Sequence, residues 1–591
     1  MAALFLMCLL NDTWNAMDAA QTKRSLVLLW LSIVFAYLLP YHVYPFNAFY
    51  NDWLVIFGIS IALLGVATEI KPRIQLPWIA LVPAGLTVPI ILQVLGGMMQ
   101  FSSDAILPVA YLLIATIAIV LGAGITANKQ LGSIHLCKIL AFAHLLAGAV
   151  SLVIACCQFL GVEYLPFMMG MPRRLGTRPY ANVGQPNQLA LLFCISIASA
   201  WWLYQAGKLS KSVAFGIVLL LMVGLVLTQS RIGWLIMPIF AWFTWSWRNR
   251  EGYKNIPAKV LTALVACYVV LIIVLPTIAA ALGVSAASAA ERVGTHSERI
   301  ALIQQALEVS FSHPWFGAGW YEFGPQQIMI GADFEPSIYV QHAHNIVLNF
   351  AAELGWPVTI LIFGALAYWF YFGCLRRASS KEVGFATLFF MAVLVHSMVE
   401  FPLWYAYVLL PMALLMGMVH QEQFGSKMIQ VPRTYIVALY CVMSMGLITV
   451  AMDYRRVVVD FRAMGWERLG LKADEGTTDK PNFTLFPYFY DYFRFAKMKP
   501  REGMSPEDIS FMEHVAKRFG YAPVMMRMSL VYGSNDRQEE AIRSMLTINR
   551  LHPNDYLAAY RVWQSMAVAS PARYMALFER LPKPNSPNSL K

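Results

Sequence analysis

Long apolar runs separated by short polar stretches fill the chain from residue 25 to residue 452. Because a membrane-spanning helix needs about 20 mostly apolar residues, this pattern predicts an all-α polytopic membrane protein with about 12–14 transmembrane helices. The predicted spans lie near residues 25–43, 52–70, 77–95, 106–126, 137–160, 188–206, 212–228, 231–248, 259–282, 345–373, 383–399, 402–420 and 434–452. Residues 25–452 therefore form the predicted transmembrane domain, after residues 1–24, which we expect in the cytoplasm.

The longest polar stretch between two predicted spans runs from about residue 283 to residue 344. Some of its apolar residues recur at spacings of three and four, which predicts an amphipathic helix whose apolar face lies on the membrane surface. These residues are Ile300, Ile303, Leu307 and Phe311. Glycines and aromatic residues in 314–320 then predict a turn with little side-chain bulk. A long loop with its own helical pattern indicates a functional segment.

Residues 453–581 carry abundant charge and no spanning run, which predicts a helical domain outside the membrane. Short helical patterns occur at 506–518, 522–532, 538–550 and 555–566. Helix pairs closed by turns such as Pro-Asn-Asp are similar to tetratricopeptide units. The tail of residues 582–591 is rich in Pro, Asn and Ser, and we expect it to be disordered.

Composition supports the membrane prediction. Hydrophobic residues make up 58% of the 591 residues, charged residues make up 13%, and mean hydropathy is +0.56, which excludes an ordinary soluble enzyme. The net charge of +11 is a topology signal in such a chain, so the expected partner is the lipid bilayer and not nucleic acid. The eight cysteines have neither zinc-type spacing nor a disulfide framework, so they are expected to pack in the apolar runs.

Lys and Arg gather on alternate short loops, which predicts that these loops face the cytoplasm. The residues concerned are Lys23, Arg24, Lys71, Arg73, Lys129, Lys208, Lys211, Arg248, Arg250, Lys254, Arg376, Arg377, Lys381, Lys427 and Arg433. The intervening loops carry Asp52, Asp104 and Glu400 and are expected to face outward. The long loop and everything after residue 452 are therefore predicted to be extracytoplasmic.

Four polar clusters fall on this outer side, within 178–188, 229–231, 341–345 and 396–405. Arg231 stands out because its surroundings are uncharged, and a central Arg costs about 2.5–3.5 kcal/mol on insertion scales. This position indicates an anionic partner; the alternative is an arginine that only snorkels to the interface. Other basic residues on the same side are Arg173, Arg174, Arg178, Arg292 and Arg299.

These residue types suit the binding of a phosphate group and the activation of a hydroxyl group. The guanidinium fork binds phosphate oxygens in pairs and stays charged. A hydroxyl nucleophile needs a general base, and histidine is the usual choice. His342 and His344 lie where a polar loop meets a long apolar helix, whose positive end favours a neutral imidazole. The alternative is that both histidines only cap the helix or fill a turn.

Four motifs carry a family signal: Gly184-Gln-Pro-Asn-Gln-Leu-Ala190, Gln229-Ser-Arg231, His342-Ala-His-Asn-Ile-Val-Leu348 and His396-Ser-Met-Val-Glu-Phe-Pro-Leu-Trp-Tyr405. Together they resemble the bacterial O-oligosaccharyltransferases of the PglL type, which belong to the O-antigen ligase and polymerase superfamily. The resemblance covers roughly residues 160–420 well and the C-terminal domain more loosely. It implies transfer of a preassembled glycan from undecaprenyl pyrophosphate to Ser or Thr hydroxyls of exported proteins such as pilins. It also implies a place in the bacterial inner membrane, a site facing the periplasm, and no cofactor or metal.

Carried over by position, the resemblance makes His344 the base that deprotonates the acceptor hydroxyl, with His396 as the rival base. Arg178 and Arg231 would hold the pyrophosphate and stabilise its developing charge. The remaining expected site residues contact substrate or support the histidines, and they are Gln185, Asn187, His342, Asn345, Glu400 and Tyr405. Because His396 and Glu400 are four apart, the alternative is that they simply pair with each other.

Three other functions use similar residues. An O-antigen ligase would transfer the same donor glycan to lipid A-core, and a polymerase would join repeat units. A membrane transporter would also place charges within the membrane, but transporters of the common kinds show repeated halves, which this sequence lacks. The large outer domain and the run Pro402-Leu-Trp-Tyr405 favour a protein acceptor.

Overall fold

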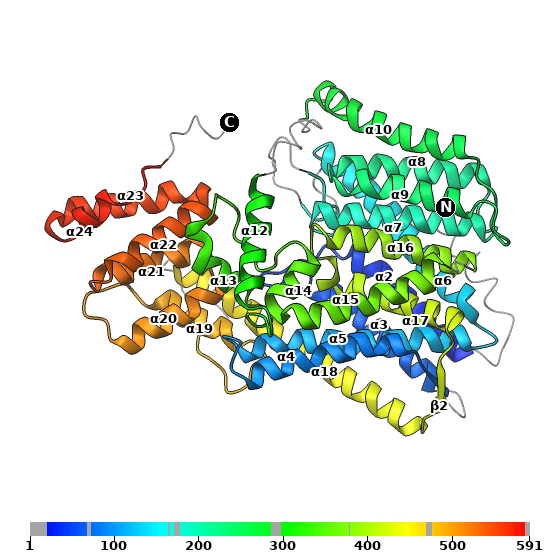
Figure 1. Cartoon of the computed structure of the whole chain (residues 1–591), viewed down its shortest axis with the longest axis horizontal. Coiled ribbons are helices and arrows are strands. Elements are labelled where there is room, and N and C mark those ends of the chain that lie inside the picture. The colour runs from blue at the N-terminus through cyan, green and yellow to red at the C-terminus, as the bar shows by residue number, and fades with distance from the viewer. Residues whose placement is uncertain are drawn as a thin grey trace. The chain divides into compact units, whose positions relative to one another are not determined.

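The computed structural model describes residues 20–67, 73–162, 166–170, 178–284, 297–376, 379–468 and 476–584 (Figure 1). The chain divides into two compact units. The first comprises Met1–Leu86, Ala110–Arg292 and Gly364–Ala451, and the second comprises Thr87–Val109, Val293–Phe363 and Met452–Lys591. The expectations for residues 1–19, for Arg173, Arg174 and Arg292, and for the end of the tail fall outside the described residues.

Helices account for nearly all the regular structure of the described residues, and each predicted span coincides with helical structure. The helices are α2 (Ala20–Leu38), α3 (Phe49–Ala67), α4 (Leu81–Leu95), α5 (Ile106–Ala127), α6 (Gly132–Phe159), α7 (Pro186–Gln205), α8 (Lys211–Leu227), α9 (Ile232–Trp247), α10 (Ala258–Ala281), α15 (Trp356–Phe370), α16 (Lys381–Ser397), α17 (Ala406–Gln423) and α18 (Arg433–Arg468). In the described chain, 7 helices are long and apolar enough to cross a membrane, and further apolar helices are shorter. The all-α polytopic fold is thus confirmed.

The prediction of one unbroken span over residues 345–373 is wrong. The chain forms α14 (Ile346–Leu354) and then α15, with a break at Gly355. Gly355 has φ 83°, and a Cβ there would lie 2.5 Å from the carbonyl oxygen of Trp315. Because the turn 314–320 approaches so closely, only glycine fits at the break. The last predicted span is also longer than expected, since α18 continues from residue 452 to Arg468.

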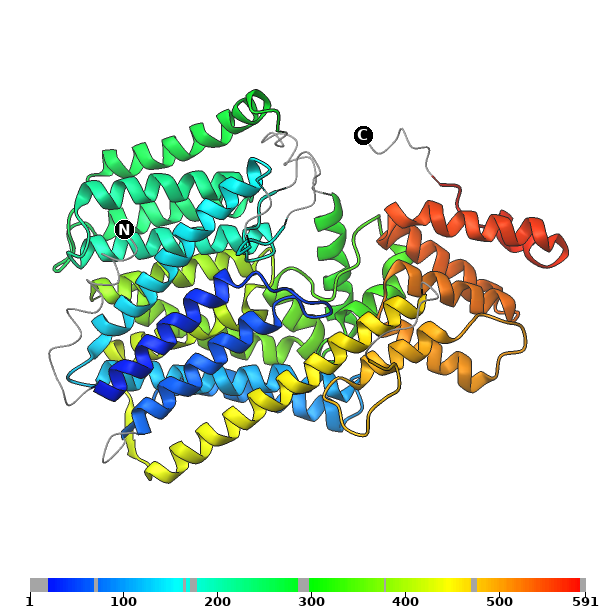
Figure 2. The same ribbon diagram turned by 180° about the vertical axis from the view of Figure 1, so that it is seen from behind.

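Helix α7 is the core of the first unit. It packs against α6, α8, α9 and α16, and large side chains such as Phe193 and Trp202 on it are fully buried. Helices α2 and α3 lie side by side in the same unit (Figure 2). A helix enclosed on several sides is a rigid support. The N-terminal end of α7 carries Gln185 and Asn187, so these two predicted site residues stand on the most enclosed helix of the unit.

Loops predicted to face the same side contact one another in the first unit. Strands β1 (Arg73–Leu76) and β2 (Lys427–Gln430) pair antiparallel, with Arg73 opposite Gln430. The backbone N–H of Lys254 donates to Gln205 Oε1 at 2.6 Å. Three of these four segments come from loops predicted to be cytoplasmic, and Gln205 is the last residue of α7, next to another such loop. On the side predicted to face outward, the backbone N–H of Ala406 donates to Asp52 Oδ1 at 2.7 Å. These contacts agree with the alternation of the predicted loops.

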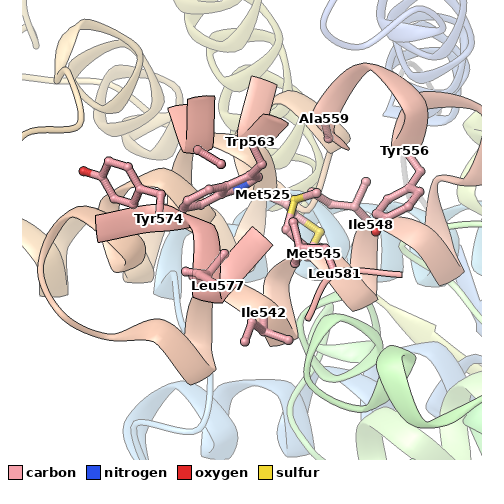
Figure 3. Close-up of a cluster of buried hydrophobic side chains, with 12 residues drawn as sticks. Met525, Ile542, Met545, Ile548, Tyr556, Ala559, Trp563, Tyr574, Leu577 and Leu581 are labelled. Atoms are coloured by element: carbon pink, nitrogen blue, oxygen red, sulfur yellow. The ribbon is translucent and has the colours of Figure 1, made fainter. Parts of the chain in front are cut away.

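The second unit combines the long loop with the C-terminal helices. Its helices are α12 (Ser297–Ser312), α13 (Phe323–Ile330), α14, α19 (Pro487–Lys497), α20 (Pro506–Arg518), α21 (Ala522–Ser534), α22 (Gln538–Leu551), α23 (Pro553–Ala569) and α24 (Pro571–Glu579). Helices α19 to α24 pack pairwise in sequence order. Their core contains Met545, Trp563 and Leu577, all buried (Figure 3). This is the predicted arrangement of helical hairpins.

Helix α12 confirms the amphipathic helix predicted in the long loop. One face, with Leu302 and Val309, is buried against α13 and α14. The predicted apolar row lies on the other face, where Ile300 is 54% and Phe311 is 66% exposed. The Phe311 ring lies 5.9 Å from that of Trp356, the first residue of a candidate membrane span. An uncovered apolar row next to a span is what a membrane-surface helix presents, and that placement stays a prediction.

Helices α5 and α17 are in close contact at Gly122 of α5 and Gly417 of α17, which gives a test of the packing. A Cβ at Gly122 would lie 2.0 Å from the carbonyl oxygen of Leu414, whereas one at Gly124 would meet nothing within 4 Å. We expect Gly122→Ala to destabilise the protein by about 1–3 kcal/mol through overpacking. Gly124→Ala on the same helix should cause no loss. Thermal unfolding of the purified protein in detergent measures both, and equal melting temperatures for the two variants would contradict this packing.

Candidate functional site

Two of the four predicted polar clusters, 178–188 and 396–405, meet in the first unit through one chain of hydrogen bonds that also reaches Thr228, the residue before a third cluster. Arg178 donates from Nη2 to Asn187 Oδ1 at 2.7 Å and from Nε to the carbonyl oxygen of Thr228 at 2.8 Å. Asn187 donates from Nδ2 to Glu400 Oε1 at 2.7 Å. The Asn187 amide therefore links a cation to a carboxylate and is satisfied on both sides. Residues far apart in sequence are fixed at the N-terminal end of α7.

Buried amides hold the loop before α7 in place. Gln158, in the last turns of α6, accepts from the backbone N–H of Ala181 at 2.7 Å through Oε1 and donates to the carbonyl oxygen of Met169 at 3.0 Å. Asn182 donates to the carbonyl oxygen of Leu38 at 2.7 Å. Each buried polar atom that finds a partner in this way avoids a desolvation penalty of about 1–3 kcal/mol. The loop that carries Arg178 is consequently tied to α2 and α6.

The turn between α8 and α9 lies beside the same chain of bonds. Thr228 and Ser230 are buried, and Gln229 has the left-handed φ of 53° that side chains rarely adopt. Arg231 is the N-cap residue of α9 and is partly exposed. Because Arg178 binds the Thr228 carbonyl, the two predicted phosphate-binding arginines belong to adjoining segments.

The segment 396–405 separates its predicted residues. His396, in the last turn of α16, is fully buried, and neither ring nitrogen has a hydrogen-bond partner among the described residues. The Glu400 carboxylate accepts from Asn187, so the suggested pairing of His396 with Glu400 is not seen. Tyr405 is the N-cap residue of α17, and the N–H of its neighbour Ala406 donates to Asp52, an acidic residue that was not among the expected site residues.

The fourth cluster belongs to the second unit, in the loop that leads into α14. Its backbone is held by buried amide side chains, since Gln327 Oε1 accepts from the Val340 N–H and Asn349 Oδ1 accepts from the Ala343 N–H, both at 2.9 Å. Asn345 is the N-cap of α14 and accepts from the N–H groups of Val347 and Leu348. The helix is therefore capped by Asn345, so capping does not require either histidine.

The two histidines have different surroundings. His342 is buried, and its ring meets the Tyr321 ring edge to face, with centroids 5.2 Å apart. Burial, followed by the nearby His344 and Arg518, lowers the pKa of His342 to about 3, so this imidazole is neutral. His344 is partly exposed and has a φ of 51°. Of the two, His344 is the one that a substrate can reach from solvent.

Backbone strain gathers in these segments. Five non-glycine residues of the described chain have positive φ, and four of them lie in or beside the candidate site, namely Ala181, Gln229, Tyr321 and His344. Each such residue costs on the order of 1–3 kcal/mol and persists only where its surroundings fix it, which is common at functional sites. A single sequence does not reveal backbone angles, so it gives no sign of these positive-φ residues.

The predicted residues thus sort into three groups. Arg178, Asn187 and Glu400 form one hydrogen-bonded chain. Gln185 and Asn345 act as helix caps, because the Gln185 side chain accepts from the Gln188 N–H at 2.6 Å. The third group contains the residues outside the first two, which are Arg231, His342, His344, His396 and Tyr405. Among the described residues, no group of three or more His, Cys, Asp or Glu side chains is arranged to hold a metal ion.

An apolar cavity lies elsewhere in the first unit, between α7, α8, α9 and α10. Its lining includes Trp201, Phe215 and Phe240, and none of the predicted site residues takes part. The cavity therefore does not identify the reacting site.

Comparisons with known proteins agree with the motifs. The family described as O-antigen ligase matches residues 215–363, and the family described as virulence factor membrane-bound polymerase, C-terminal, matches residues 385–566. The chain is 25% identical over 550 residues to a general O-oligosaccharyltransferase of Acinetobacter baylyi, covering 90% of this chain and 94% of that protein. It is 23% identical over 396 residues to a ComP-specific O-oligosaccharyltransferase of the same organism, covering 66% and 69%. No solved structure matches the chain.

The fold and these matches are typical of a multi-pass membrane protein, and part of the chain is similar to the O-antigen ligase family. The chain is also similar to the O-oligosaccharyltransferases, which confirms the resemblance predicted from the motifs.

The lowered pKa of His342 gives a pH test of the loop that leads into α14 and carries His342 and His344, which we call the histidine loop. Unfolding releases this imidazole to its ordinary pKa of about 6.5, so between about pH 6.5 and 3 the unfolded chain binds the extra proton. The contribution to stability is complete above this range and is lost as pH falls, by about 1.4 kcal/mol per pH unit. Thermal unfolding across pH 4–7 should show a shallower acid loss for His342→Asn than for the wild type. Parallel curves would show that His342 is not buried as a neutral group.

Proposed function

We propose that this protein is an O-oligosaccharyltransferase that moves a preassembled glycan from a polyprenyl pyrophosphate to Ser or Thr hydroxyls of exported proteins. The donor is expected to be undecaprenyl pyrophosphate, and pilin is the expected type of acceptor. The site would face the periplasm from the bacterial inner membrane. The observation that carries the proposal is the bonded chain of Arg178, Asn187 and Glu400, which joins separate family motifs at the end of one enclosed helix.

The arginines suit the donor. Arg178 and Arg231 lie in adjoining segments, since Arg178 binds the carbonyl oxygen of Thr228. Two guanidinium groups would bind the pyrophosphate oxygens and stabilise the charge that develops as the pyrophosphate leaves. Asn187 and Glu400 fix the orientation of Arg178, so that its geometry is set before the donor arrives. Gln185 would act chiefly by capping α7 and not by binding sugar.

His344 is the proposed base. It would take the proton of the acceptor hydroxyl while that oxygen attacks the anomeric carbon of the first sugar. The bond from this carbon to the pyrophosphate oxygen breaks, and polyprenyl pyrophosphate leaves with the bonding electrons. A base must reach the hydroxyl within hydrogen-bond distance. His344 is partly exposed, whereas His396 is fully buried, so accessibility favours His344.

An O-antigen ligase that uses lipid A-core as its acceptor is the second candidate, because one matching family is described by that activity. The relative that spans nearly the whole chain is instead named for O-oligosaccharyl transfer. Co-expression with a pilin separates the two. A glycan-sized increase in the intact mass of the pilin supports the proposal, whereas new lipopolysaccharide bands with an unmodified pilin indicate a ligase.

His344→Ala should abolish glycan transfer in proteoliposomes that contain lipid-linked glycan and acceptor, because the hydroxyl loses its base. General base catalysis contributes about 10²–10⁴-fold, which sets the size of the expected fall in kcat. His396→Ala, made alongside, should retain more activity. The result that excludes His344 as the base is near wild-type transfer by His344→Ala together with loss in His396→Ala.

Arg231→Lys keeps the charge but loses the planar fork, so binding of the pyrophosphate should weaken. We expect a lower kcat/KM for the donor, by about tenfold or more for each lost charge-assisted contact of about 1.5–3 kcal/mol. Arg248→Lys is the matched control, since Arg248 is the C-cap residue at the other end of α9. Initial rates at varied donor concentration measure the effect. Equal kcat/KM in both variants would exclude paired phosphate binding by Arg231.

A further inference from the structure

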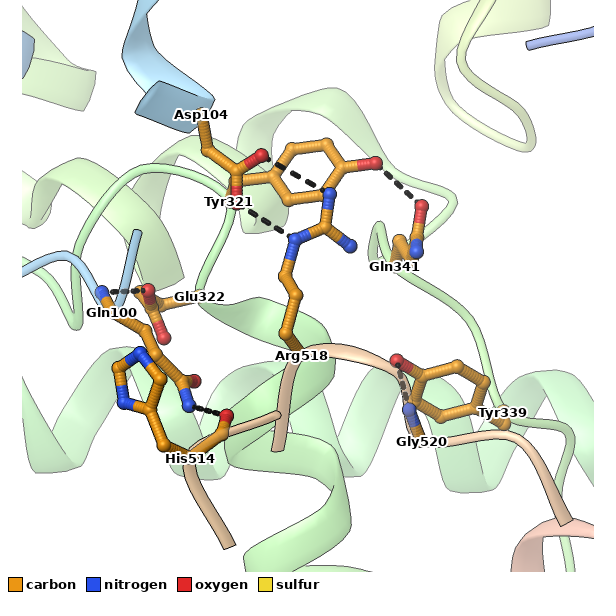
Figure 4. A network of polar contacts seen from close by, with 9 residues as sticks. All are labelled: Gln100, Asp104, Tyr321, Glu322, Tyr339, Gln341, His514, Arg518 and Gly520. Carbon is orange, nitrogen blue, oxygen red and sulfur yellow. Dashed lines mark hydrogen bonds and ion pairs between the residues drawn. The ribbon is translucent and has the colours of Figure 1, made fainter. Parts of the chain in front are cut away.

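A buried ion pair of the second unit lies close to the histidine loop (Figure 4). Arg518, the last residue of α20, donates from Nε to Asp104 Oδ2 at 2.7 Å and from Nη2 to Asp104 Oδ1 at 3.1 Å. The two side chains are only 6% and 9% exposed. Paired donation in a buried place makes this a strong and directional contact. It joins residues that are 414 positions apart.

Tyr321 connects this ion pair to the histidine loop. The guanidinium carbon of Arg518 lies 4.4 Å from the centre of the Tyr321 ring, within the range of a cation–π contact. The Tyr321 hydroxyl donates to Gln341 Oε1, and its ring packs edge to face against His342. Figure 4 shows Tyr321 between Arg518 and Gln341. One aromatic ring therefore contacts the cation, the loop side chain and the buried histidine.

The residues after Arg518 hold the same loop from its other end. The backbone N–H of Gly520 donates to the Tyr339 hydroxyl at 3.3 Å. The N–H groups of Ser337 and Tyr339 donate to the carbonyl oxygens of Arg550 and Leu551 at 2.9 and 3.2 Å. The loop that leads to His344 is thus bonded along its length to the C-terminal helices.

The backbone conformation of Tyr321 indicates that surrounding contacts hold this residue in place. Its φ is 68°, a conformation that a tyrosine adopts only where surrounding contacts fix it. Removing one partner of a buried ion pair leaves an uncompensated charge, so the arrangement is sensitive to single substitutions. His344, two residues beyond His342, also has positive φ. Two strained positions are thus joined through Tyr321, Gln341 and His342.

We infer that Arg518 is a positioning residue that acts through Tyr321 and Gln341 to hold the His342–His344 loop in its reactive conformation. This inference rests on the proposed function for its effect on transfer, but its effect on the loop can be measured without any activity. The C-terminal helices then support the base and do more than cover the outer surface. A misplaced base lowers turnover while leaving donor binding intact, because the arginines proposed to bind the donor are other residues.

The experiment compares matched pairs of variants in the full-length reconstituted protein. Arg518→Gln removes the buried pair, and Arg580→Gln removes a second paired contact, between Arg580 and Glu539, that is exposed. Tyr321→Phe removes the bond to Gln341, and Tyr556→Phe removes a bond to the Pro582 carbonyl within the C-terminal helices. Arg518→Lys tests whether charge alone restores function.

Two readouts are taken. The first is amide hydrogen exchange, in which Arg518→Gln and Tyr321→Phe should raise the exchange of Val340 and Ala343 while α22 and α23 stay protected. The second is transfer kinetics, in which kcat should fall roughly tenfold to 100-fold with little change in KM for the donor. Arg518→Lys should recover part of the kcat, and both control variants should match the wild type.

The outcomes separate the two proposals. Faster exchange in the loop with a matching fall in kcat supports the positioning role. Unchanged exchange at Val340 and Ala343 in both variants would overturn it, whatever the activity. Faster exchange with wild-type kcat would also overturn it, since the loop conformation would then not matter to transfer. If the wild type transfers no glycan to any acceptor, the proposed function fails while the exchange result still decides whether Arg518 orders the loop.

Discussion

Charged groups enclosed by apolar helices are costly unless they have partners inside the protein, and this constraint accounts for the paired charges of both units. In the first unit, Asp52 accepts hydrogen bonds from the Ala406 N–H and the Tyr111 hydroxyl. A buried carboxylate thus fixes the start of α17. The same rule accounts for Arg178, Asn187 and Glu400, which satisfy one another in a line. Since unpaired charges within a membrane are costly, such contacts are kept for structure or for chemistry.

Each unit then supports one part of the proposed reaction. The first holds a cation and a carboxylate against the most enclosed helix, which suits the binding of a charged head group. The second holds two histidines in a loop that is bonded on one side to α13 and α14 and on the other to the C-terminal helices. Positive φ at Gln229 and His344 places strained backbone in both. Rigid supports of this kind fix reacting groups before substrate binds, which lowers the barrier to reaction.

Much of this arrangement follows from sequence, and the exceptions have physical causes. Hydropathy locates the spans because apolar runs of that length are rare outside membranes. It misses the break at Gly355, because a glycine with positive φ does not interrupt an apolar run. Motifs bring Asn187 and Glu400 to attention, and the predicted topology brings Arg178, but neither reveals the carbonyl of Thr228 that binds Arg178. Arg518 and Tyr321 lie in no motif, and their contact depends on the pairing of segments distant in sequence, which a single chain does not reveal. Asn345 was expected to contact substrate or support the histidines, and it is the N-cap residue of α14, a role that local capping preferences favour.

The central claim is that Arg178 and Arg231 bind the pyrophosphate of a lipid-linked donor. The most direct measurement uses a polyprenyl-pyrophosphate glycan with a photoreactive group on its first sugar, crosslinked to the protein in proteoliposomes and mapped by mass spectrometry. The account predicts that the labelled peptides contain Arg178 or Arg231, with competition by unlabelled donor. Labelling that is confined to peptides lining the apolar cavity, with neither arginine peptide labelled, would contradict it.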